Sequence, residues 1–393
     1  MMKKSIINRK LKLRMDESVL LFGPRGTGKS TLLSRYFSEE NALWLDLLKA
    51  SVEEKYTRNP DTLIAEVSAL PAKKTHVIID EIQKIPKLLD IVHYLIEHTN
   101  KHFILSGSSA RKIKNNAANL LAGRAFVYYL APFTYTEVGG KFSIEAALNW
   151  GMLPKIYQYK DATQKKKFLQ SYARTYLKEE VWFEQLVRNL DPFRYFLEVA
   201  AQCDGKIINY SNIARDVGVD YKTVENYYTI LEDTLLGFFV HAYSGSFRKQ
   251  INQAPKFYFF DVGVSRSLAR MISLPPRERT HYYGDLFEQF IIIEIKKYID
   301  YAQNEYRLMY LRTKTGAEID LIVDRPGKKL LLIEIKSSKD VQENQLKNLC
   351  ALKKEFPSCE AICFSQDINK KKFGDIVVWP WQEGIEYYFA GES

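Results

Sequence analysis

Residues 23–30 read Gly23-Pro24-Arg25-Gly26-Thr27-Gly28-Lys29-Ser30. The apolar run Val19–Phe22 precedes them, and a helical stretch begins with Thr31. The spacing G-x-x-x-x-G-K-[S/T] between a strand and a helix is the context that identifies a P-loop, a turn that binds phosphate. Glycines let backbone N–H groups curl around phosphate oxygens, and the start of the helix adds its positive dipole end. Residues 23–31 are therefore expected to hold the phosphates of a nucleotide.

Lys29 and Ser30 have distinct expected roles in this loop. The Lys29 ammonium is expected to reach the β- and γ-phosphates, and the Ser30 hydroxyl to take a coordination position on Mg²⁺. The expected cofactors are therefore ATP and Mg²⁺.

A second buried-type run, residues 75–79, ends in Asp80-Glu81. An Asp at the end of a parallel strand beside a P-loop can hold the Mg²⁺ shell. Glu81 is then placed to orient and deprotonate an attacking water, which favours hydrolysis over binding alone. The alternative is an acidic pair that only starts a helix, since the residues from Ile82 onward look helical.

A third strand, His102–Leu105, ends in Ser106, whose hydroxyl is expected to sense the γ-phosphate or to position water. A plain strand-to-loop turn is the alternative, because Ser and Gly favour turns. Arg111 and Arg124 are candidates for an arginine finger donated to a neighbouring subunit, so the chain is expected to form homo-oligomers. For each of them, a surface arginine paired with an acid or with solvent is the alternative.

The composition excludes several classes of protein. Of 393 residues, 46% are hydrophobic and 26% are charged, which is ordinary for a globular protein of two or three domains. The net charge of +10 suits a polyanionic partner such as DNA. The four cysteines form no CxxC pair, so a reducing cytoplasm is expected rather than a disulfide framework or a zinc site. No signal peptide and no apolar run of about 18 residues is present, so no membrane association is expected.

Strand-like runs near 19–22, 42–46, 75–80, 102–106 and 125–130 alternate with helical segments. This alternation predicts an α/β fold class, with a parallel sheet covered by helices on both faces.

The middle of the chain has the pattern of a helix-turn-helix. Residues 150–190 read as a helical linker or lid that ends at a break, Asp191-Pro192. Farther on, residues 211–217 predict a short helix, Gly218-Val219 a turn, and Asp220 the cap of a second helix. The apolar face expected on the second helix consists of Val224, Tyr228, Leu231 and Leu235. The outward face consists of Tyr221, Lys222, Thr223 and Asn226.

Two β-prone runs, 237–243 and 256–260, follow this second helix. The loop between them contains Arg248 and Lys249, which suit a wing beside DNA. Glu225 on the reading face is a poor neighbour for phosphate, so a protein-interaction or lid module is the alternative to DNA contact.

The last third carries acidic residues on two β-type runs, 317–323 and 330–336, joined by a turn. Strand alternation places Asp320 nearly opposite Glu334, and Lys336 shares the face of Glu334. Facing carboxylates repel unless a cation lies between them, so a second metal site is expected here.

The acidic pattern is the D…(D/E)-x-K of restriction-endonuclease-like phosphodiesterases, which use Mg²⁺ to cut DNA. Glu288, on a predicted helix over residues 285–299, is similar to the extra acidic residue that many of them place there. An exposed hairpin face with cross-strand ion pairs, or a fold that kept the geometry without cleavage, is the alternative.

Together these motifs resemble one group of bacterial and archaeal AAA-type ATPases whose C-terminal half is a domain of unknown function. The motifs that carry the resemblance lie at residues 23–30, 78–83, 105–109, 121–124, 256–263, 284–288 and 312–320. The resemblance covers nearly the whole chain and implies an ATPase. Its C-terminal motifs are specific to the group but imply little about activity.

Four segments are expected. They are a P-loop ATPase domain at 1–135, a helical linker at 136–205, a winged helix-turn-helix at 206–275 and an α/β restriction-endonuclease-like domain at 276–393. The leading hypothesis is an ATP-hydrolysing protein that acts on DNA. Two alternatives stay open: a nucleotide-switched DNA-binding or interaction protein with negligible turnover, and an ATP-dependent DNA endonuclease.

Overall fold

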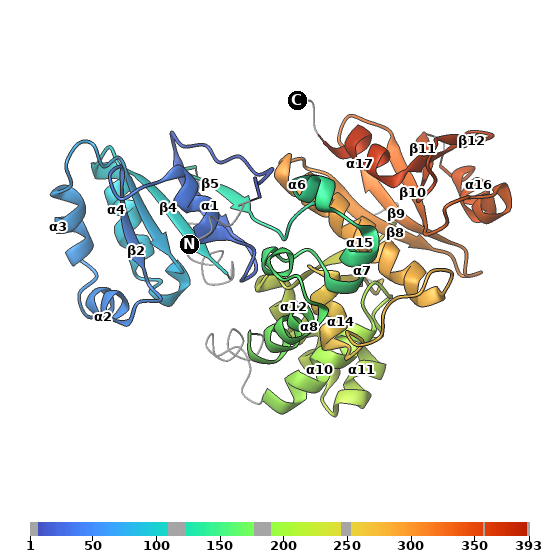
Figure 1. The fold of residues 1–393 in the computed structure, drawn as a ribbon, viewed down its shortest axis with the longest axis horizontal. Coiled ribbons are helices and arrows are strands. Elements are labelled where there is room, and N and C mark those ends of the chain that lie inside the picture. The colour runs from blue at the N-terminus through green and yellow to red at the C-terminus, as the bar shows by residue number, and fades with distance from the viewer. Residues whose placement is uncertain are drawn as a thin grey trace. The chain divides into compact units, whose positions relative to one another are not determined.

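A computed structural model describes residues 7–108, 121, 123–176, 190–244, 253–356 and 358–390 of the chain. The described chain divides into two compact units (Figure 1). The first unit comprises Met1–Phe133 with the short stretches Leu153–Lys155 and Asp233–Leu236, and the second unit contains the remainder.

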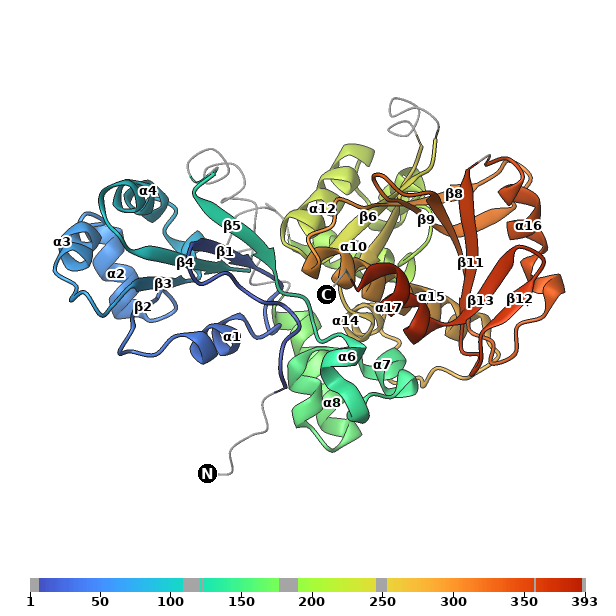
Figure 2. The same ribbon diagram turned by 90° about the horizontal axis from the view of Figure 1, so that it is seen from above.

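The first unit is built on a parallel five-stranded sheet with the order β2-β3-β4-β1-β5. Its strands are β1 Ser18–Phe22, β2 Ala42–Asp46, β3 His76–Asp80, β4 His102–Gly107 and β5 Ala125–Tyr129. Its helices are α1 Lys29–Tyr36, α2 Ala50–Arg58, α3 Thr62–Ser68 and α4 Leu88–His98, with a 3-10 turn η1 at Ile82–Lys84. Helices α1 and α4 lie on opposite faces of the sheet (Figure 2). The expected α/β class with its parallel sheet is confirmed.

The strands β1 and β3 are buried along their whole length, because helices cover both faces of the sheet. Their sequences are therefore continuous apolar runs. Leu20, Ile79 and Leu105 pack in one core cluster with residues of α4. Since all five strands run the same way, the carboxyl ends of β1, β3 and β4 meet at one edge of the sheet.

The second unit begins with helices that precede its sheet. They are α6 Tyr135–Val138, η2 Gly139–Lys141, α7 Ile144–Trp150, η3 Pro154–Gln158, α8 Ala162–Ser171, a π-helical turn Tyr172–Tyr176, and α10 Leu190–Gln202. Asp191-Pro192 lies in the first turn of the described part of α10; residues 177–189 lie outside the described residues, so the expected break between the linker and α10 stays a prediction. Proline is tolerated there because the first N–H groups of a helix have no partner within it.

The helix-turn-helix elements are α11 Tyr210–Val217 and α12 Tyr221–Asp233. The turn between them contains Gly218 in the left-handed region, at φ 76°. The Asp220 carboxylate caps α12 by accepting the Thr223 N–H at 2.9 Å. The helix ends at Asp233, so the expectation that Leu235 continues its apolar face is wrong; Leu235 has φ 60° and lies beyond the helix.

The strands that follow α12 join the C-terminal strands in one sheet. This eight-stranded mixed sheet has the order β12-β13-β11-β10-β9-β8-β6-β7. Its strands are β6 Gly237–Ala242, β7 Lys256–Phe259, β8 Arg307–Arg312, β9 Glu318–Asp324, β10 Leu330–Lys336, β11 Cys359–Ser365, β12 Lys371–Phe373 and β13 Ile376–Pro380. The segments expected as separate at 206–275 and 276–393 therefore share this sheet. Arg248 and Lys249 lie outside the described residues.

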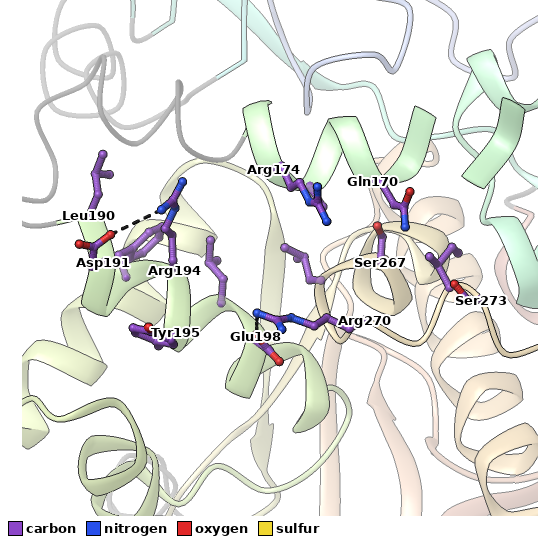
Figure 3. Close-up of a pocket in the computed structure, with 15 residues that line it drawn as sticks. Gln170, Arg174, Leu190, Asp191, Arg194, Tyr195, Glu198, Ser267, Arg270 and Ser273 are labelled. Atoms are coloured by element: carbon purple, nitrogen blue, oxygen red, sulfur yellow. Dashed lines mark hydrogen bonds and ion pairs between the residues drawn. The ribbon is translucent and has the colours of Figure 1, made fainter. Parts of the chain in front are cut away.

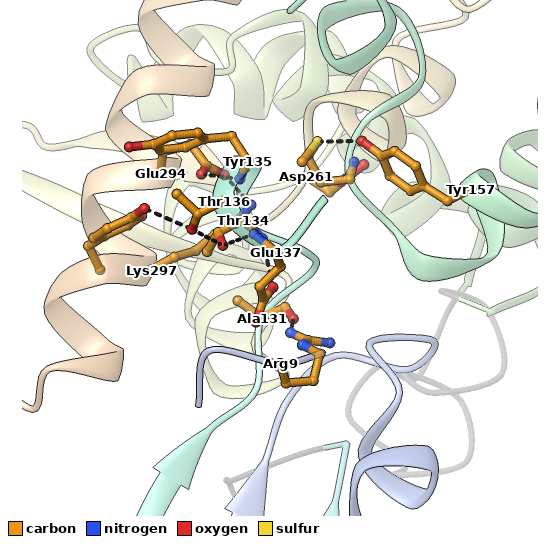
Figure 4. A network of polar contacts seen from close by, with 12 residues as sticks. Arg9, Ala131, Thr134, Tyr135, Thr136, Glu137, Tyr157, Asp261, Glu294 and Lys297 are labelled. Carbon is orange, nitrogen blue, oxygen red and sulfur yellow. Dashed lines mark hydrogen bonds and ion pairs between the residues drawn. The ribbon is translucent and has the colours of Figure 1, made fainter. Parts of the chain in front are cut away.

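Helices pack against this second sheet. They are α14 Val262–Leu268, α15 His281–Tyr301, α16 Lys347–Lys353 after the 3-10 turn η5 Glu343–Leu346, and α17 Trp381–Phe389. Helix α15 contains a fully buried ion pair, in which the Lys297 ammonium lies 2.7 Å from the Glu294 carboxylate. The same carboxylate accepts the backbone N–H of Tyr135 at 3.0 Å, which ties α15 to the start of α6 (Figure 4).

Candidate functional site

The P-loop follows β1 and requires glycine at defined positions. A Cβ on Gly23 would lie 2.2 Å from the carbonyl oxygen of Leu130, a distance that real Cβ atoms essentially never show. Gly26 and Gly28 have φ values of 80° and 95°, which L side chains rarely adopt. The glycines of the motif therefore set the backbone path that turns N–H groups toward a phosphate.

Arg9 links the loop to the sheet, a role that no sequence motif indicated. Its guanidinium donates hydrogen bonds to the carbonyl oxygens of Thr27 at 2.7 Å and Ala131 at 2.5 Å (Figure 4). It also lies 4.9 Å from the ring centroid of Phe133, within the range of a cation–π contact. These contacts link the loop to the segment that follows β5.

Lys29 is buried inside the loop. Only 5% of its surface is exposed, and its ammonium donates to the carbonyl oxygen of Gly23 at 2.7 Å. The Thr27 hydroxyl donates to the carbonyl oxygen of Pro24 at 2.8 Å, which closes the turn around the lysine. The positive charge is therefore held at the centre of the loop.

Ser30 and Asp80 meet at the carboxyl edge of the sheet. The Ser30 hydroxyl donates to one carboxylate oxygen of Asp80 at 2.6 Å, and the Ser106 hydroxyl donates to the other. Asp80 and Ser106 are register partners on β3 and β4, which explains this contact. A hydroxyl and a carboxylate in contact supply the hard oxygen ligands that Mg²⁺ prefers, so these residues fit the cation.

Glu81 has a strained backbone and a fixed carboxylate. Its φ and ψ are 62° and 47°, the left-handed region that is uncommon for a residue other than glycine. Its carboxylate accepts hydrogen bonds from the Gln83 amide and, at 3.3 Å, from the Ser108 hydroxyl. The same Gln83 amide also donates to Ser108 at 3.0 Å. The sequence indicated Glu81 but gave no signal for Gln83 or Ser108 as its partners.

Arg124 lies at the opposite edge of the same sheet. It precedes β5, which runs parallel to β1 with Ala125 beside Ser18, whereas the P-loop follows the other end of β1. Its guanidinium forms an ion pair with Glu97 on α4. The structure therefore does not bring Arg124 to the P-loop of its own chain. Arg111 lies outside the described residues.

A second group of charged residues lies on β9, β10, β7 and α15. The register of β9 with β10 pairs Leu321 with Ile333, so Asp320 and Glu334 are the next residues in line across the two strands. Asp320 accepts the Ile335 N–H at 2.7 Å, and the Lys336 ammonium donates to Glu334 at 2.5 Å. The second carboxylate oxygen of Glu334 is buried and has no hydrogen-bond partner in the part of the chain that the structure describes.

Lys256 of β7 joins this group from another part of the sequence. Its ammonium lies 2.6 Å from Glu318 and 3.5 Å from Glu288, and it is 4% exposed. The Tyr258 hydroxyl donates to the same Glu288 oxygen at 3.3 Å. No local pattern indicated that Lys256 faces these carboxylates, since 62 positions separate it from Glu318.

Burial sets the protonation of these groups. Desolvation, together with the neighbouring Asp320 charge, raises the pKa of Glu288 to about 7 and that of Glu334 to about 8. Desolvation also raises the pKa of Asp320. Burial opposes the charges of Lys256 and Lys336, but the adjacent carboxylates outweigh it and raise both lysine pKa values.

Two lysines, Lys256 and Lys336, offset part of the negative charge of the four carboxylates in this group. In the part of the chain that the structure describes, no group of three or more His, Cys, Asp or Glu side chains is arranged to hold a metal ion. The charges of Glu288, Asp320 and Glu334 interact with one another, and ion pairs with Lys256 and Lys336 offset part of them. A second metal at Glu288, Asp320 and Glu334 stays a prediction.

Three family models match successive parts of the chain. An AAA domain matches residues 15–139, a domain of unknown function (DUF8612) matches 141–274, and another (DUF4143) matches 283–383. The expected combination of an AAA domain with a C-terminal domain of unknown function is confirmed. Among the described residues, no helix has the length and apolar character that crossing a membrane requires.

The similar curated proteins are uncharacterized. One from Methanocaldococcus jannaschii is 23% identical, and the match covers 93% of this chain and 84% of that protein. One from Haemophilus influenzae is 22% identical, and the match covers 63% of this chain and 68% of that protein.

Two solved structures show a distant likeness. The Aeropyrum pernix ORC1 protein in complex with DNA is 13% identical over 65% of this chain and 86% of that chain, with a TM-score of 0.25. A chain of the Thermococcus gammatolerans McrB AAA+ hexamers with bound McrC is 12% identical. The match covers 51% of this chain and 72% of that chain, with a TM-score of 0.20.

Proposed function

We propose that this chain, in which an AAA domain at residues 15–139 precedes two domains of unknown function, binds ATP with Mg²⁺, hydrolyses it and acts on DNA. The observation that supports hydrolysis best is the contact of Ser30 with Asp80 beside the buried Lys29 and the fixed Glu81 carboxylate. The contact brings the two proposed metal-binding oxygens together next to a base.

Each residue contributes a separate step. The N–H groups of the loop bind phosphate oxygens, and the Lys29 ammonium exchanges its bond to Gly23 for the β- and γ-phosphates. Ser30 and Asp80 hold Mg²⁺, which supplies charge neutralisation on the phosphates when bound. Glu81 accepts a proton from the attacking water, and its contacts with Gln83 and Ser108 orient the accepting oxygen.

Two serines on α1 give a matched test of this site. Ser30→Ala removes the hydroxyl that contacts Asp80, whereas Ser34→Ala removes an exposed hydroxyl that bonds only to the Thr31 carbonyl oxygen. Calorimetry with ATP should show that Ser30→Ala loses the increase in affinity given by Mg²⁺ and that Ser34→Ala keeps it. Lys29→Ala should abolish phosphate release. Absence of any heat of binding in the unmodified protein would refute the ATP site.

Arg124 is proposed to complete the site of a neighbouring subunit in a homo-oligomer. The position of Arg124 at the amino edge of the sheet, with its side chain 38% exposed, supports action outside its own chain. Lys29→Ala and Arg124→Ala subunits should each be inactive, yet a mixture should recover phosphate release. Oligomers that form by light scattering without any recovery on mixing would contradict this role.

Contact with DNA is proposed for α12. Tyr221, Lys222 and Asn226 are exposed on this helix, while Val224 and Tyr228 are buried against the rest of the module. Lys222→Ala should weaken binding to all duplex sequences alike and reduce the slope of affinity against salt by about 1. The exposed Lys354, at the end of α16, gives a control of equal charge. An equal loss of DNA affinity in Lys354→Ala would show that the overall positive charge, rather than α12, accounts for the binding.

DNA cleavage by the C-terminal unit is the second candidate function. The observation that favours it is the alignment of Asp320 with Glu334, together with the buried Glu334 oxygen that has no partner. Supercoiled plasmid incubated with Mg²⁺ or Mn²⁺ should be nicked by the unmodified protein and not by Asp320→Asn. Equal nicking by both would identify a contaminating nuclease and remove the support for this candidate.

A further inference from the structure

A separate pocket lies in the second unit, between α8, α10 and α14. Its volume is about 600 Å³, within the range of small-molecule sites. Gln170 and Arg174 line it from the end of α8 and the π-helical turn. Ser267 lines it from α14, and Arg270 lines it from two residues beyond the end of that helix (Figure 3). None of these residues belongs to the P-loop or to the acidic group.

The pocket carries an excess of positive charge. Its three arginines are Arg174, Arg194 and Arg270, and its two acidic residues are Asp191 and Glu198. Arg270 pairs with Glu198 at 2.8 Å, and Arg194 pairs with Asp191 at 3.5 Å. Among the described residues, the Arg174 guanidinium has no hydrogen bond or ion pair with any other. One guanidinium is therefore available for an anion.

Ser267 gives an independent sign of a ligand. The residue is only 9% exposed, and its hydroxyl has no hydrogen-bond partner among the described residues. Figure 3 shows the hydroxyl directed toward Gln170 and Arg174, into the pocket. Buried hydroxyls normally form a hydrogen bond, because a hydroxyl buried without a partner loses its hydrogen bond to water and gains none in its place. A ligand oxygen beside Arg174 would satisfy this hydroxyl.

The remaining wall is apolar and includes an aromatic ring. Phe193, Leu197 and Ile272 contribute buried apolar surface. Tyr195 also lines the pocket, and 61% of its surface is exposed. An exposed aromatic ring near guanidinium groups is the combination that binds a nucleotide, since the ring stacks on the base and arginine pairs with phosphate.

We infer that this pocket binds a nucleotide through its phosphate, with Arg174 and Ser267 on the phosphate oxygens and Tyr195 on the base. The nucleotide is either free or one unit of a single DNA strand, because both present the same phosphate and base. The inference does not rest on ATP hydrolysis, since the P-loop belongs to the other compact unit.

The test uses the full chain carrying Lys29→Ala, so that the P-loop does not contribute. Calorimetry measures the binding of thymidine monophosphate and of inorganic phosphate, and fluorescence anisotropy measures the binding of a short labelled oligothymidylate. Arg174→Ala should weaken nucleotide binding by about tenfold or more. Arg307→Ala is the matched control, because Arg307 is exposed on β8 and does not line the pocket.

Ser267→Ala separates binding from folding. Removal of the Ser267 hydroxyl, which is buried without a hydrogen-bond partner among the described residues, should leave the melting temperature unchanged or raise it, while nucleotide affinity falls. Arg174-dependent binding of the monophosphate identifies a free nucleotide, and Arg174-dependent binding of the oligonucleotide alone identifies a strand. Affinities that are equal in Arg174→Ala and Arg307→Ala overturn the inference. Inorganic phosphate that binds as tightly as the monophosphate overturns the assignment to a nucleotide.

Discussion

The close packing of Gly23 against the Leu130 carbonyl group predicts the effect of adding one methyl group at Gly23. In Gly23→Ala the new Cβ would lie 2.2 Å from the carbonyl oxygen of Leu130 and 3.2 Å from the Thr27 hydroxyl. Leu130 has little freedom to retreat, because its N–H donates to the carbonyl oxygen of Phe22 at 2.7 Å at the end of the β1–β5 pair. The loop itself therefore has to move.

The size of the movement sets the expected loss. Reaching 3.0 Å, the distance below which real Cβ atoms essentially never lie, requires a shift of at least about 0.8 Å. A displacement near 1 Å in an active site lowers the rate by about 10²-fold, and an overpacked contact costs about 1–3 kcal/mol of stability. We expect ATP turnover in Gly23→Ala to fall by about 10- to 100-fold while the protein stays folded.

Steady-state phosphate release and a thermal melt measure the two effects. Gly140→Ala is the matched control, because a Cβ on Gly140 would meet no atom within 4 Å and its φ is not in the left-handed region. It should keep both turnover and melting temperature. Unchanged turnover in a folded Gly23→Ala protein would refute the claim that this close approach sets the path of the loop.

Three further changes test other parts of the structure. Glu81→Gln keeps the shape of the side chain but removes the proposed base, so ATP should still bind while single-turnover phosphate formation falls by about 10²- to 10⁴-fold; turnover within twofold of the unmodified protein would contradict the role. Lys297→Met leaves the buried Glu294 without its ion pair and should lower the free energy of unfolding in denaturant by about 3–5 kcal/mol, whereas an unchanged midpoint would show that the pair contributes little. Burial raises the pKa of Asp204 to about 7 from 3.8, so the folded protein holds a proton that the unfolded chain releases, and stability should fall as pH rises between these values. Asp204→Asn should reduce that slope in denaturant titrations across this pH range, while Glu288 and Glu334, whose pKa values are also raised, keep part of it; an unaltered slope would assign it to groups other than Asp204.

Local patterns were sufficient to predict the fold class and the P-loop. The parallel sheet follows from apolar runs that alternate with helical segments, and the loop follows from fixed spacing between neighbouring residues. The turn at Gly327 lies near the centre of the predicted hairpin, so pairing across β9 and β10 could also be predicted from alternation.

The residues that support each candidate site could not be predicted in the same way. Arg9, Gln83 and Ser108 act on the P-loop region through contacts that no local spacing encodes. Lys256 reaches Glu318 only because β7 and β9 belong to one sheet, and that sheet forms through the pairing of β6 with β8. Long-range strand pairing is not written in any short stretch of sequence.

The pairing of β6 with β8 limits how this protein can be divided. His241 and Ala242 are register partners of Met309 and Tyr310, and the Tyr243 N–H donates to the Tyr310 carbonyl oxygen at 2.6 Å. A fragment ending near residue 275 would expose the unpaired side of β6, and the complementary fragment would expose β8. Bare strand edges of this kind associate with other chains. The helix-turn-helix and the acidic hairpin are therefore expected to fold together, and neither is expected to form a stable fragment when the chain is cut between them.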